Sequence, residues 1–562
     1  MSIIIKKLTL LVVITVFFTS CNNKKEKMEQ DLRDFIASHE AAVVDLSAES
    51  ARAYYSAALS GKEEDYQKYA TLSLQESKIY ANKESFAKIK KIKESGLVND
   101  TVLKRQMDVL YNLYQGNQMD EKVLEALIQL STSIENRFST FRVVLDGKEV
   151  GDNDVDELLR TSKDNKVLEQ AWTESKKIGP LVAEDVIKLV KMRNEAARSM
   201  GYDNYHQMSL MLSDQDPEEV AMLFDELDSL TRDTYAGLKA EVDSFLSVRV
   251  GVPVGELMPW HYQNRFFQEA PAIYNVNLDA YYAGKDLNEL TRLYYEGLGL
   301  PIDEILANSD MFEKPGKNQH AFCINIDRKK DVRVLCNVRP NAYWMNTNLH
   351  EFGHAVYDRY LGEGLPYTLK TPAHIFTTEA IAMIFGRMSS NPYWMEQMGL
   401  LSAEERDRIY QESFNTLRLE QLVFSRWSQV MFRFEKSMYE NPDQDLNKLW
   451  WDIVEKYQMV KKPENRNMPD WATKIHIATS PCYYHNYLMG ELLASQLQHY
   501  ISTEILKTDQ VNQQCFVNQK AVGSFLLEKV FKPGALYQWN EMIEKATGEK
   551  LTAKHYAAQF VY

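Results

Sequence analysis

Apolar residues recur at the spacing of a single helix face through most of residues 30–250. This segment is rich in Glu, Lys, Ala and Leu, and Pro180 and Pro217 are its only prolines. Pro217 is followed by two glutamates, and a proline with acidic residues in the first turn is typical of a helix start. The pattern therefore predicts long amphipathic helices, which continue through 163–200 and 217–249.

Patterns typical of strands are sparse. In residues 321–338, apolar residues alternate with polar ones on both sides of a charged turn at 327–330, which predicts a β-hairpin. Residues 251–275 are rich in aromatic side chains and contain three prolines, so we expect an irregular connection there. The predicted fold class is all-α with one small β-hairpin.

Composition narrows the class of protein. The chain has 562 residues, of which 45% are hydrophobic and 26% charged, and this balance excludes disordered and multi-span membrane proteins. The net charge is −14 and no basic stripe is present, so nothing supports binding to nucleic acid. With only 23 glycines and 16 prolines the chain encodes few turns, which favours one large helical domain over several small ones.

The N-terminus has the pattern of an export signal. Two lysines precede the apolar run at residues 8–18, which is too short for a ~30 Å hydrocarbon core and predicts a signal peptide at 1–20. Cys21 follows two small residues, an arrangement that resembles a bacterial lipoprotein signal; the alternative is an ordinary cleaved signal with an incidental cysteine. We expect a lipid on Cys21 that anchors the protein to the membrane at the bacterial cell envelope, a polar tether at 21–29 and one domain at 30–562.

A candidate metal motif lies at residues 350–354, which read His-Glu-Phe-Gly-His. On a helix, positions i and i+4 lie on one face about 6 Å apart, so both imidazoles can bind one Zn²⁺. Glu351 then lies next to the open coordination position, where a general base of a metallopeptidase is needed. The alternative is that His350 and His354 are two core histidines on either side of a glutamate.

A catalytic zinc site needs a third protein ligand. Glu379 is a candidate because it follows two threonines and opens an apolar helical run, which suggests the start of a second helix. Asp358 and Glu363 also follow the motif, and His374 is a rival ligand. The residues alone leave this choice open.

Taken together, three segments resemble the angiotensin-converting enzyme, or peptidyl-dipeptidase A, family of gluzincins. They are the metal motif, Glu379-Ala380-Ile381, and Lys474-Ile475-His476-Ile477 followed by Tyr484 and Tyr487. Weaker similarity extends over roughly residues 35–560. The resemblance implies a two-lobed helical ellipsoid with a deep central channel, covered by lid helices at about 30–110.

The resemblance also implies roles for individual residues. His350, His354 and Glu379 become the ligands of one Zn²⁺ per chain and Glu351 the base, while His476 and Tyr487 stabilise the tetrahedral intermediate and Lys474 and Tyr484 bind the substrate's C-terminal carboxylate.

Several positions depart from the family pattern. Met383 stands where the family has an aspartate that orients a zinc ligand, and Asn486 replaces a chloride-binding arginine, which argues against chloride activation there. Ile324 replaces a substrate-binding histidine. A glutamine that binds the substrate carboxylate is expected near Trp260, where Gln263 is available.

Two further assignments stay open. Cys323 and Cys336 resemble a family disulfide with a shorter loop, but their spacing allows two reduced cysteines equally well. Tyr483 is an alternative to Tyr484 for binding the substrate carboxylate. The interval from His476 to Tyr487 is one residue longer here than in the family, and the assignment of Tyr484 requires that the extra residue lies within 478–482.

The sequence thus predicts a zinc-dependent peptidase that acts on short peptides and releases C-terminal dipeptides, since a lysine beside the site favours a free carboxylate. One alternative is a zinc oligoendopeptidase with an open cleft. The other is a lipid-anchored protein that binds peptides without cleaving them.

Overall fold

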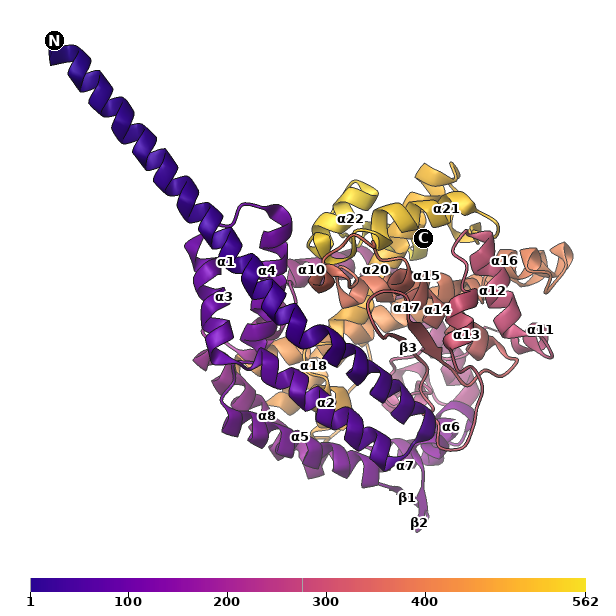
Figure 1. The fold of residues 1–562 in the computed structure, drawn as a ribbon. Coiled ribbons are helices and arrows are strands. Elements are labelled where there is room, and N and C mark those ends of the chain that lie inside the picture. The colour runs from indigo at the N-terminus through magenta and orange to yellow at the C-terminus, as the bar shows by residue number, and fades with distance from the viewer. Residues whose placement is uncertain (1, 275, 562) are drawn as a thin grey trace.

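The computed structural model describes residues 2–274 and 276–561, with side chains described from residue 24 onward. Helices make up most of the described chain, and the strands within it form two small antiparallel hairpins (Figure 1). The predicted all-α class with a small hairpin is confirmed, and β1–β2 is a second hairpin that the sequence pattern did not predict.

The N-terminal part consists of helices that pack partly on one another. Its elements are α1 (Ser2–Ser60), α2 (Glu63–Tyr80), α3 (Lys83–Ser95), α4 (Thr101–Gly116), α5 (Glu121–Thr140), β1 (Val143–Leu145) and β2 (Lys148–Val150). Phe35 of α1, Ile89 of α3 and Leu110 of α4 belong to a hydrophobic cluster that is separate from the main core. Helix α2 has no buried residue and lies against α1 (Figure 1). Helices α1, α3 and α4 therefore share a small core of their own, whereas α5 packs into the main core through Leu127 and Ile134.

The next helices begin and end at clear capping signals. They are α6 (Asp152–Thr161), α7 (Asn165–Ser175), α8 (Ile178–Ser199), α9 (Tyr205–Leu212) and α10 (Pro217–Val250). The Asp216 side chain caps α10, as expected for a helix that opens with proline, and Gly251 ends it with a φ of 71° that glycine adopts without strain. Residues 251–274 form a largely irregular connection, as predicted.

The C-terminal half contains the core of the molecule. Its elements are α11 (Asp279–Tyr282), α12 (Leu287–Gly297), α13 (Asp303–Asn308), β3 (Phe322–Asn325), β4 (Val332–Leu335), α14 (Ala342–Arg359), α15 (Ile375–Met388), α16 (Pro392–Gln397), α17 (Ala403–Glu440), α18 (Leu446–Gln458), α19 (Ile475–Thr479), α20 (His485–Tyr500), α21 (Lys520–Leu526), α22 (Trp539–Thr547) and α23 (Lys554–Phe560). The predicted hairpin pairs Cys323 with Val334. Tyr55 and Ala58 of α1 pack against Ile326 and Leu335, so the hairpin joins the N-terminal helices to the core.

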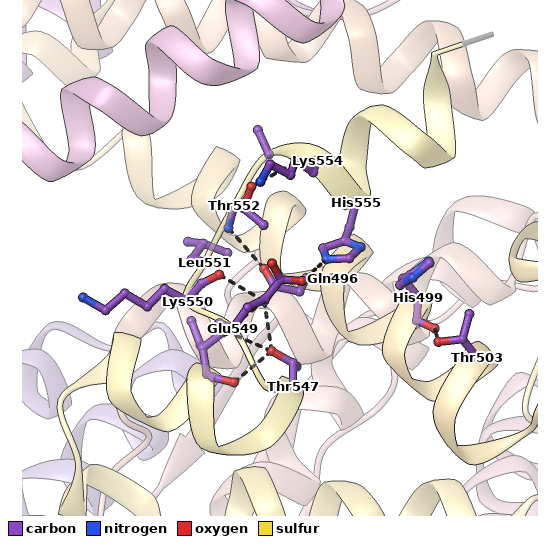
Figure 2. Close-up of polar contacts among 12 residues, drawn as sticks. Gln496, His499, Thr503, Thr547, Glu549, Lys550, Leu551, Thr552, Lys554 and His555 are labelled. Atoms are coloured by element: carbon purple, nitrogen blue, oxygen red, sulfur yellow. Dashed lines mark hydrogen bonds and ion pairs between the residues drawn. The ribbon is translucent and has the colours of Figure 1, made fainter.

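A buried amide of α20 helps to hold the C-terminal end of the chain. The Gln496 Nε2 group donates to Thr547 Oγ1 at 2.9 Å, and its Oε1 atom accepts from the Thr552 backbone N–H at 3.2 Å (Figure 2). Beside it, His555 Nε2 lies 2.6 Å from Glu549 Oε1. The Gln496 contacts hold this segment against α20, whose first turn carries Tyr487.

The predicted signal peptide at 1–20 and the lipid on Cys21 concern side chains outside the described ones. Within the described residues, no helix contains a stretch long and apolar enough to cross a membrane.

Candidate metal centre and substrate cleft

The His-Glu-Phe-Gly-His motif lies in the second half of α14, as predicted. His350 and His354 are one turn apart, with their rings 4.9 Å apart between centroids and their Nε2 atoms separated by 3.3 Å. Leu349, Phe352 and the neighbouring apolar residues of the helix are fully buried. Burial of α14 therefore fixes the direction in which both imidazoles point.

Helix α15 brings a carboxylate to the two histidines. Glu379 Oε2 lies 3.6 Å from the Nε2 atoms of both His350 and His354. The approach is possible because Gly353 faces α15: a Cβ at Gly353 would lie 2.7 Å from the Cα of Ala382. The glycine of the motif thus lets the two helices come close enough to share one site.

These three residues fit a zinc ion. One ligand atom from each lies within 4.8 Å of the other two, which is a span that a single metal can bridge. Burial lowers the pKa of His350 to about 4 and also lowers that of His354, so both imidazoles are neutral at pH 7, as metal binding requires. In the described part of the chain this is the one group of three such side chains in that geometry.

Rival ligands are placed elsewhere. His374 caps the start of α15, where its Nδ1 atom accepts from the Phe376 N–H at 3.2 Å. Met383, at the position of the family aspartate, packs toward Gly490 of α20. His354 is oriented instead by Thr378, whose Oγ1 lies 2.8 Å from His354 Nδ1.

Glu351 lies deeply buried beside the three candidate ligands, with 8% of its surface exposed. Burial and then the charge of Glu379 raise the pKa of Glu351 to about 8, against the opposing effect of the Cys323 backbone N–H. Burial and the charge of Glu491 likewise raise the pKa of Glu379 to about 7. Two carboxyl groups held together away from water are unfavourable unless a cation is shared between them, which further fits a metal.

The hairpin beside Glu351 contains free thiols. Cys323 and Cys336 are both unpaired, so the structure agrees with the alternative of two reduced cysteines. Ile324 lies on β3, opposite Arg333.

Lys474 lies at the start of α19 and is 8% exposed. Its Nζ atom donates to Gln268 Oε1 at 2.6 Å and lies 5.5 Å from the centre of the Tyr484 ring. Burial lowers the pKa of Lys474 to about 8, while the charge of Glu269 opposes the shift. A lysine, an amide and a tyrosine ring therefore meet in one place.

The glutamine in this group is not the one that the sequence suggested. Gln263 accepts a hydrogen bond from the Ala272 N–H at 3.1 Å and adopts a φ of 61°, so its side chain holds the loop. Gln268, five positions further on, makes the contact with Lys474. The irregular backbone of the loop determines which glutamine reaches Lys474, and no periodic pattern in the sequence predicts that choice.

The remaining predicted residues link the lysine group to the metal ligands. The His476 ring lies 5.4 Å from that of Tyr484, and the Tyr484 ring lies 5.4 Å from that of Tyr487. His476 Nδ1 is buried without a hydrogen-bond partner in the described structure. Desolvation and then the charge of Glu379 raise the pKa of the Tyr487 hydroxyl.

Tyr483 is a site residue whose place the sequence left open. Its ring packs against Tyr487 at 5.3 Å, and Glu379 raises the pKa of its hydroxyl after desolvation. Tyr484 instead contacts the lysine group. Both rings pack on Tyr487, and that of Tyr484 also lies beside Lys474. The role of either tyrosine in binding a carboxylate stays a prediction.

The cleft beside Lys474 is a cavity of about 740 Å³. Lys474, His476, Gln268 and Glu269 line one part of it, and α6 lines another. At the position of the family's chloride-binding arginine, Asn486 accepts a hydrogen bond from Gln215 Nε2 at 2.8 Å, and both amides are buried. No positive charge stands at that position.

The fold and the site together define a class of protein: a predominantly helical chain with a His-Glu-x-x-His helix and a glutamate on the following helix as a candidate metal site. The chain belongs to the angiotensin-converting enzyme family, whose model matches residues 26–251 and 268–560. The unmatched segment contains Trp260 and Gln263, and the match resumes at Gln268.

Individual relatives are distant. The chain is 24% identical over 498 residues to the angiotensin-converting enzyme of Mesocricetus auratus, with 82% of this chain and 37% of the relative covered. It is 20% identical over 438 residues to an inactive angiotensin-converting enzyme-related protein of Caenorhabditis elegans, covering 70% and 48%. It is 22% identical over 248 residues to thermostable carboxypeptidase 1 of Pyrococcus furiosus, covering 40% and 49%. The chain thus spans less than half the length of these relatives.

Proposed function

We propose that this chain is a zinc-dependent peptidase that hydrolyses short peptides and releases their C-terminal dipeptides. The observation that carries the proposal is the convergence of His350, His354 and Glu379 within 4.8 Å of one another, beside the buried carboxyl of Glu351. One zinc ion per chain fits this group.

His350, His354 and Glu379 would hold the zinc ion, which would supply polarisation of the scissile carbonyl and lower the pKa of a water molecule toward about 7. Glu351 accepts the proton of the attacking water and then gives it to the leaving amine. Both transfers would need a carboxylate close to the three ligands but not among them, and the burial of Glu351 next to His350 on α14 supports this assignment.

Negative charge develops on the former carbonyl oxygen as the water attacks. The Tyr487 hydroxyl and the unpaired His476 ring are the donors that we assign to it, and a single donor of this kind is typically worth about 10² to 10³ in rate. His476 is neutral before the reaction, because burial and then Lys474 lower its pKa to about 4. Its ring N–H therefore donates without a full charge.

Dipeptide release depends on the other end of the site. Lys474, with Gln268 and Tyr484 around it, supplies the positive group that a C-terminal carboxylate needs. An open cleft without such a group would favour internal cleavage. The presence of a largely buried lysine with no carboxylate within 4 Å in the described structure supports the exopeptidase over the oligoendopeptidase.

The alternative to an enzyme is a protein that binds peptides without cleaving them, and one relative carries the word inactive in its name. This chain retains both histidines, Glu351 and Glu379 in a metal-binding arrangement. A protein that only captured peptides would need no general base beside that arrangement. We therefore favour the enzyme over the lipid-anchored binding protein.

The cellular place is part of the same proposal. The N-terminal pattern supports export and a lipid on Cys21, followed by the tether at 21–29 and a single domain at 30–562. The α1–α4 region would act as a lid that limits substrates to short peptides. Mass spectrometry of the mature N-terminus tests the lipid.

The test of activity uses one defined peptide of about ten residues and measures its products by mass spectrometry. The zinc-loaded protein should release the C-terminal dipeptide, and removal of zinc with a chelator should stop the reaction. Zinc added back should restore it. Internal fragments alone would indicate an oligoendopeptidase, and an intact peptide under all conditions would leave only the binding role.

A further inference from the structure

Helices α15 and α20 carry two of the residues on which the proposed reaction depends, Glu379 and Tyr487, and they pack against each other. They approach closely at Gly490, where a Cβ would lie 3.2 Å from the Cβ of Glu379 and 3.1 Å from the Sδ atom of Met383. Tyr487 precedes Gly490 by three residues, so both lie on the face of α20 that contacts α15. The position of Tyr487 relative to Glu379 therefore depends on how far one helix is shifted along the other.

Gly490 permits the close approach but does not fix that shift. It has no side chain that could insert between the side chains of α15, and such insertion normally sets the register of two packed helices. The contacts run in one direction, because Gly490 faces Glu379, whereas Ser495, further along α20, contacts Arg387, further along α15. The two helices are thus parallel at their contact, and an interaction further along them can fix their register.

A buried ion pair between Arg387 of α15 and Glu491 of α20 is such an interaction. Arg387 Nη2 donates to Glu491 Oε2, and the two residues are only 7% and 9% exposed. Arg387 Nη1 also donates to Ser495 Oγ at 3.4 Å, and Gln421 Nε2 of α17 donates to Glu491 Oε1 at 3.1 Å. Both oxygens of the carboxylate thus have a donor, one from each neighbouring helix.

The pair lies on the same helix faces as the site residues. Glu491 follows Tyr487 by four residues, about one turn, and Arg387 follows Glu379 by eight, about two turns. A shift of α20 along α15 by one turn, about 5.4 Å, would separate the two charges inside the core, where an unpaired charge is costly. The ion pair therefore favours one register of the two helices and penalises others.

Stability alone does not account for an ion pair in this place. Taking two charges out of water costs free energy that their attraction often fails to offset, and well-packed apolar residues are frequently as stabilising. Ile384 of α15 and Leu492 of α20 are fully buried, so an apolar pair would meet similar surroundings. Selection of one arrangement of packed helices is the best-attested use of such buried polar groups.

We infer that Arg387 and Glu491 are positioning residues, which hold α20 on α15 in the one register that places the Tyr487 hydroxyl for the reaction. The inference rests on the proposed function, because it takes Tyr487 as a donor to the developing oxyanion. Neither residue of the pair lines the 740 Å³ cavity. Their effect on the reaction passes through Tyr487.

The experiment removes the pair as a whole in Arg387→Met/Glu491→Leu, because either single change would leave one buried charge without its partner. Circular dichroism and zinc content check that the variant is folded and loaded. Its kcat should fall by about ten- to a hundredfold, as expected for a small displacement of a reacting group, and its KM should change little. Arg387→Lys keeps the charge and should retain most of the parent's kcat.

A second double variant with the apolar volumes exchanged, Arg387→Leu/Glu491→Met, is measured in parallel and should behave in the same way. It supplies the folded protein if the first double variant is unstable. A kcat equal to that of the parent in either folded double variant would overturn the inference.

Two comparisons separate a positioning role from a general structural one. In the background of Tyr487→Phe, removal of the pair should lower kcat no further, because the hydroxyl that it displaces is absent. The control is Arg426→Met/Asp228→Leu, which removes a buried pair between α17 and α10, two helices without a predicted catalytic residue or zinc ligand. It should leave kcat unchanged. An equal loss in both backgrounds, or a similar loss in the control, would contradict the inference.

A measurement without metal or peptide separates this inference from the proposed function. A single 3-fluorotyrosine in place of Tyr487 reports by ¹⁹F NMR on the surroundings of that ring. Removal of the Arg387–Glu491 pair should shift or broaden the signal, because α20 then occupies more than one register, whereas the Arg426 and Asp228 control should not. A changed signal supports the positioning role even if no peptide is cleaved. An unchanged signal contradicts it even if the enzyme is active.

Discussion

The candidate metal end of the site and the end that we propose to bind a carboxylate are built in different ways. His350, His354 and Glu379 lie on two long helices that touch at Gly353, so their positions follow from helix geometry and close packing. Lys474 lies at the start of a five-residue helix, at the edge of a large cavity. The candidate metal ligands thus lie on long helices, whereas the residues that we propose to select the substrate lie on connecting segments, which vary more between relatives.

The irregular end is nevertheless fixed by buried polar contacts. Arg193 Nη2 donates to the Ala478 carbonyl at 2.7 Å, and the Cys482 N–H donates to Glu435 Oε1 at 2.9 Å. Cys482 has a φ of 56°, which turns the chain between His476 and Tyr484. Two long helices, α8 and α17, therefore hold the segment in which the sequence analysis places a one-residue insertion.

The strongest test of the metal end is removal of its carboxylate. Glu379→Ala leaves two imidazoles, so zinc content at a limiting zinc concentration should fall and activity should drop to background. The rise in melting temperature on adding zinc should disappear as well, since a ligand at 100 times its Kd stabilises a protein by about 2.7 kcal/mol.

Glu363→Ala is the control for that variant, because Glu363 also follows the motif but is exposed. It should bind zinc like the parent. Unchanged zinc affinity in Glu379→Ala would place the third ligand elsewhere, with His374 the next residue to change.

The second prediction separates chemistry from metal binding at the same end. Glu351→Gln should keep zinc but lose about 10² to 10⁴ in kcat, because an amide cannot accept the proton of the attacking water. Zinc analysis and turnover are measured on one sample. A rate near that of the parent would remove Glu351 from the mechanism.

The third prediction concerns Tyr487, where the two ends meet. Tyr487→Phe should lower kcat by about 10² to 10³ and change KM little, because the contact forms mainly in the transition state. Tyr66→Phe removes a hydroxyl from α2 and serves as control. If KM rises while kcat is retained, Tyr487 binds substrate and does not stabilise the oxyanion.

The fourth prediction is a pH effect that only the carboxylate-binding end should show. The lowered pKa of Lys474, about 8, means that its charge is present below that pH and is lost as pH rises through it. For a free-acid peptide, kcat/KM should therefore fall by up to about tenfold per pH unit above 8, beyond any change seen with the C-terminal amide. Parallel profiles for acid and amide would show that the lysine charge does not bind the carboxylate.

The difference between the helical metal end and the irregular segments around Lys474 also explains which residues could be predicted from the sequence. His350 and His354 are four residues apart on one helix, so their spacing alone defines their geometry, and the helices, their caps and the β3–β4 hairpin follow from similar local rules. Gln268 could not be chosen over Gln263 in this way, because its contact with Lys474 joins segments 206 residues apart in the sequence.

Tertiary contacts also decided between neighbours that local patterns leave equal. Tyr483 and Tyr484 differ only in which side of the chain they face after the turn at Cys482. His374 and Glu379 were both plausible ligands until the start of α15 was placed. The roles assigned to these residues stay predictions.

The most direct test of dipeptide release compares one peptide as its free acid and as its C-terminal amide. If Lys474 and Tyr484 bind the carboxylate, the amide should lose about ten- to over a hundredfold in kcat/KM, as expected for a charge-assisted contact of about 1.5 to 3 kcal/mol. Lys474→Met should slow the free acid and reduce the difference between the two peptides. Equal rates on acid and amide in the parent enzyme would contradict the account and make the protein an oligoendopeptidase.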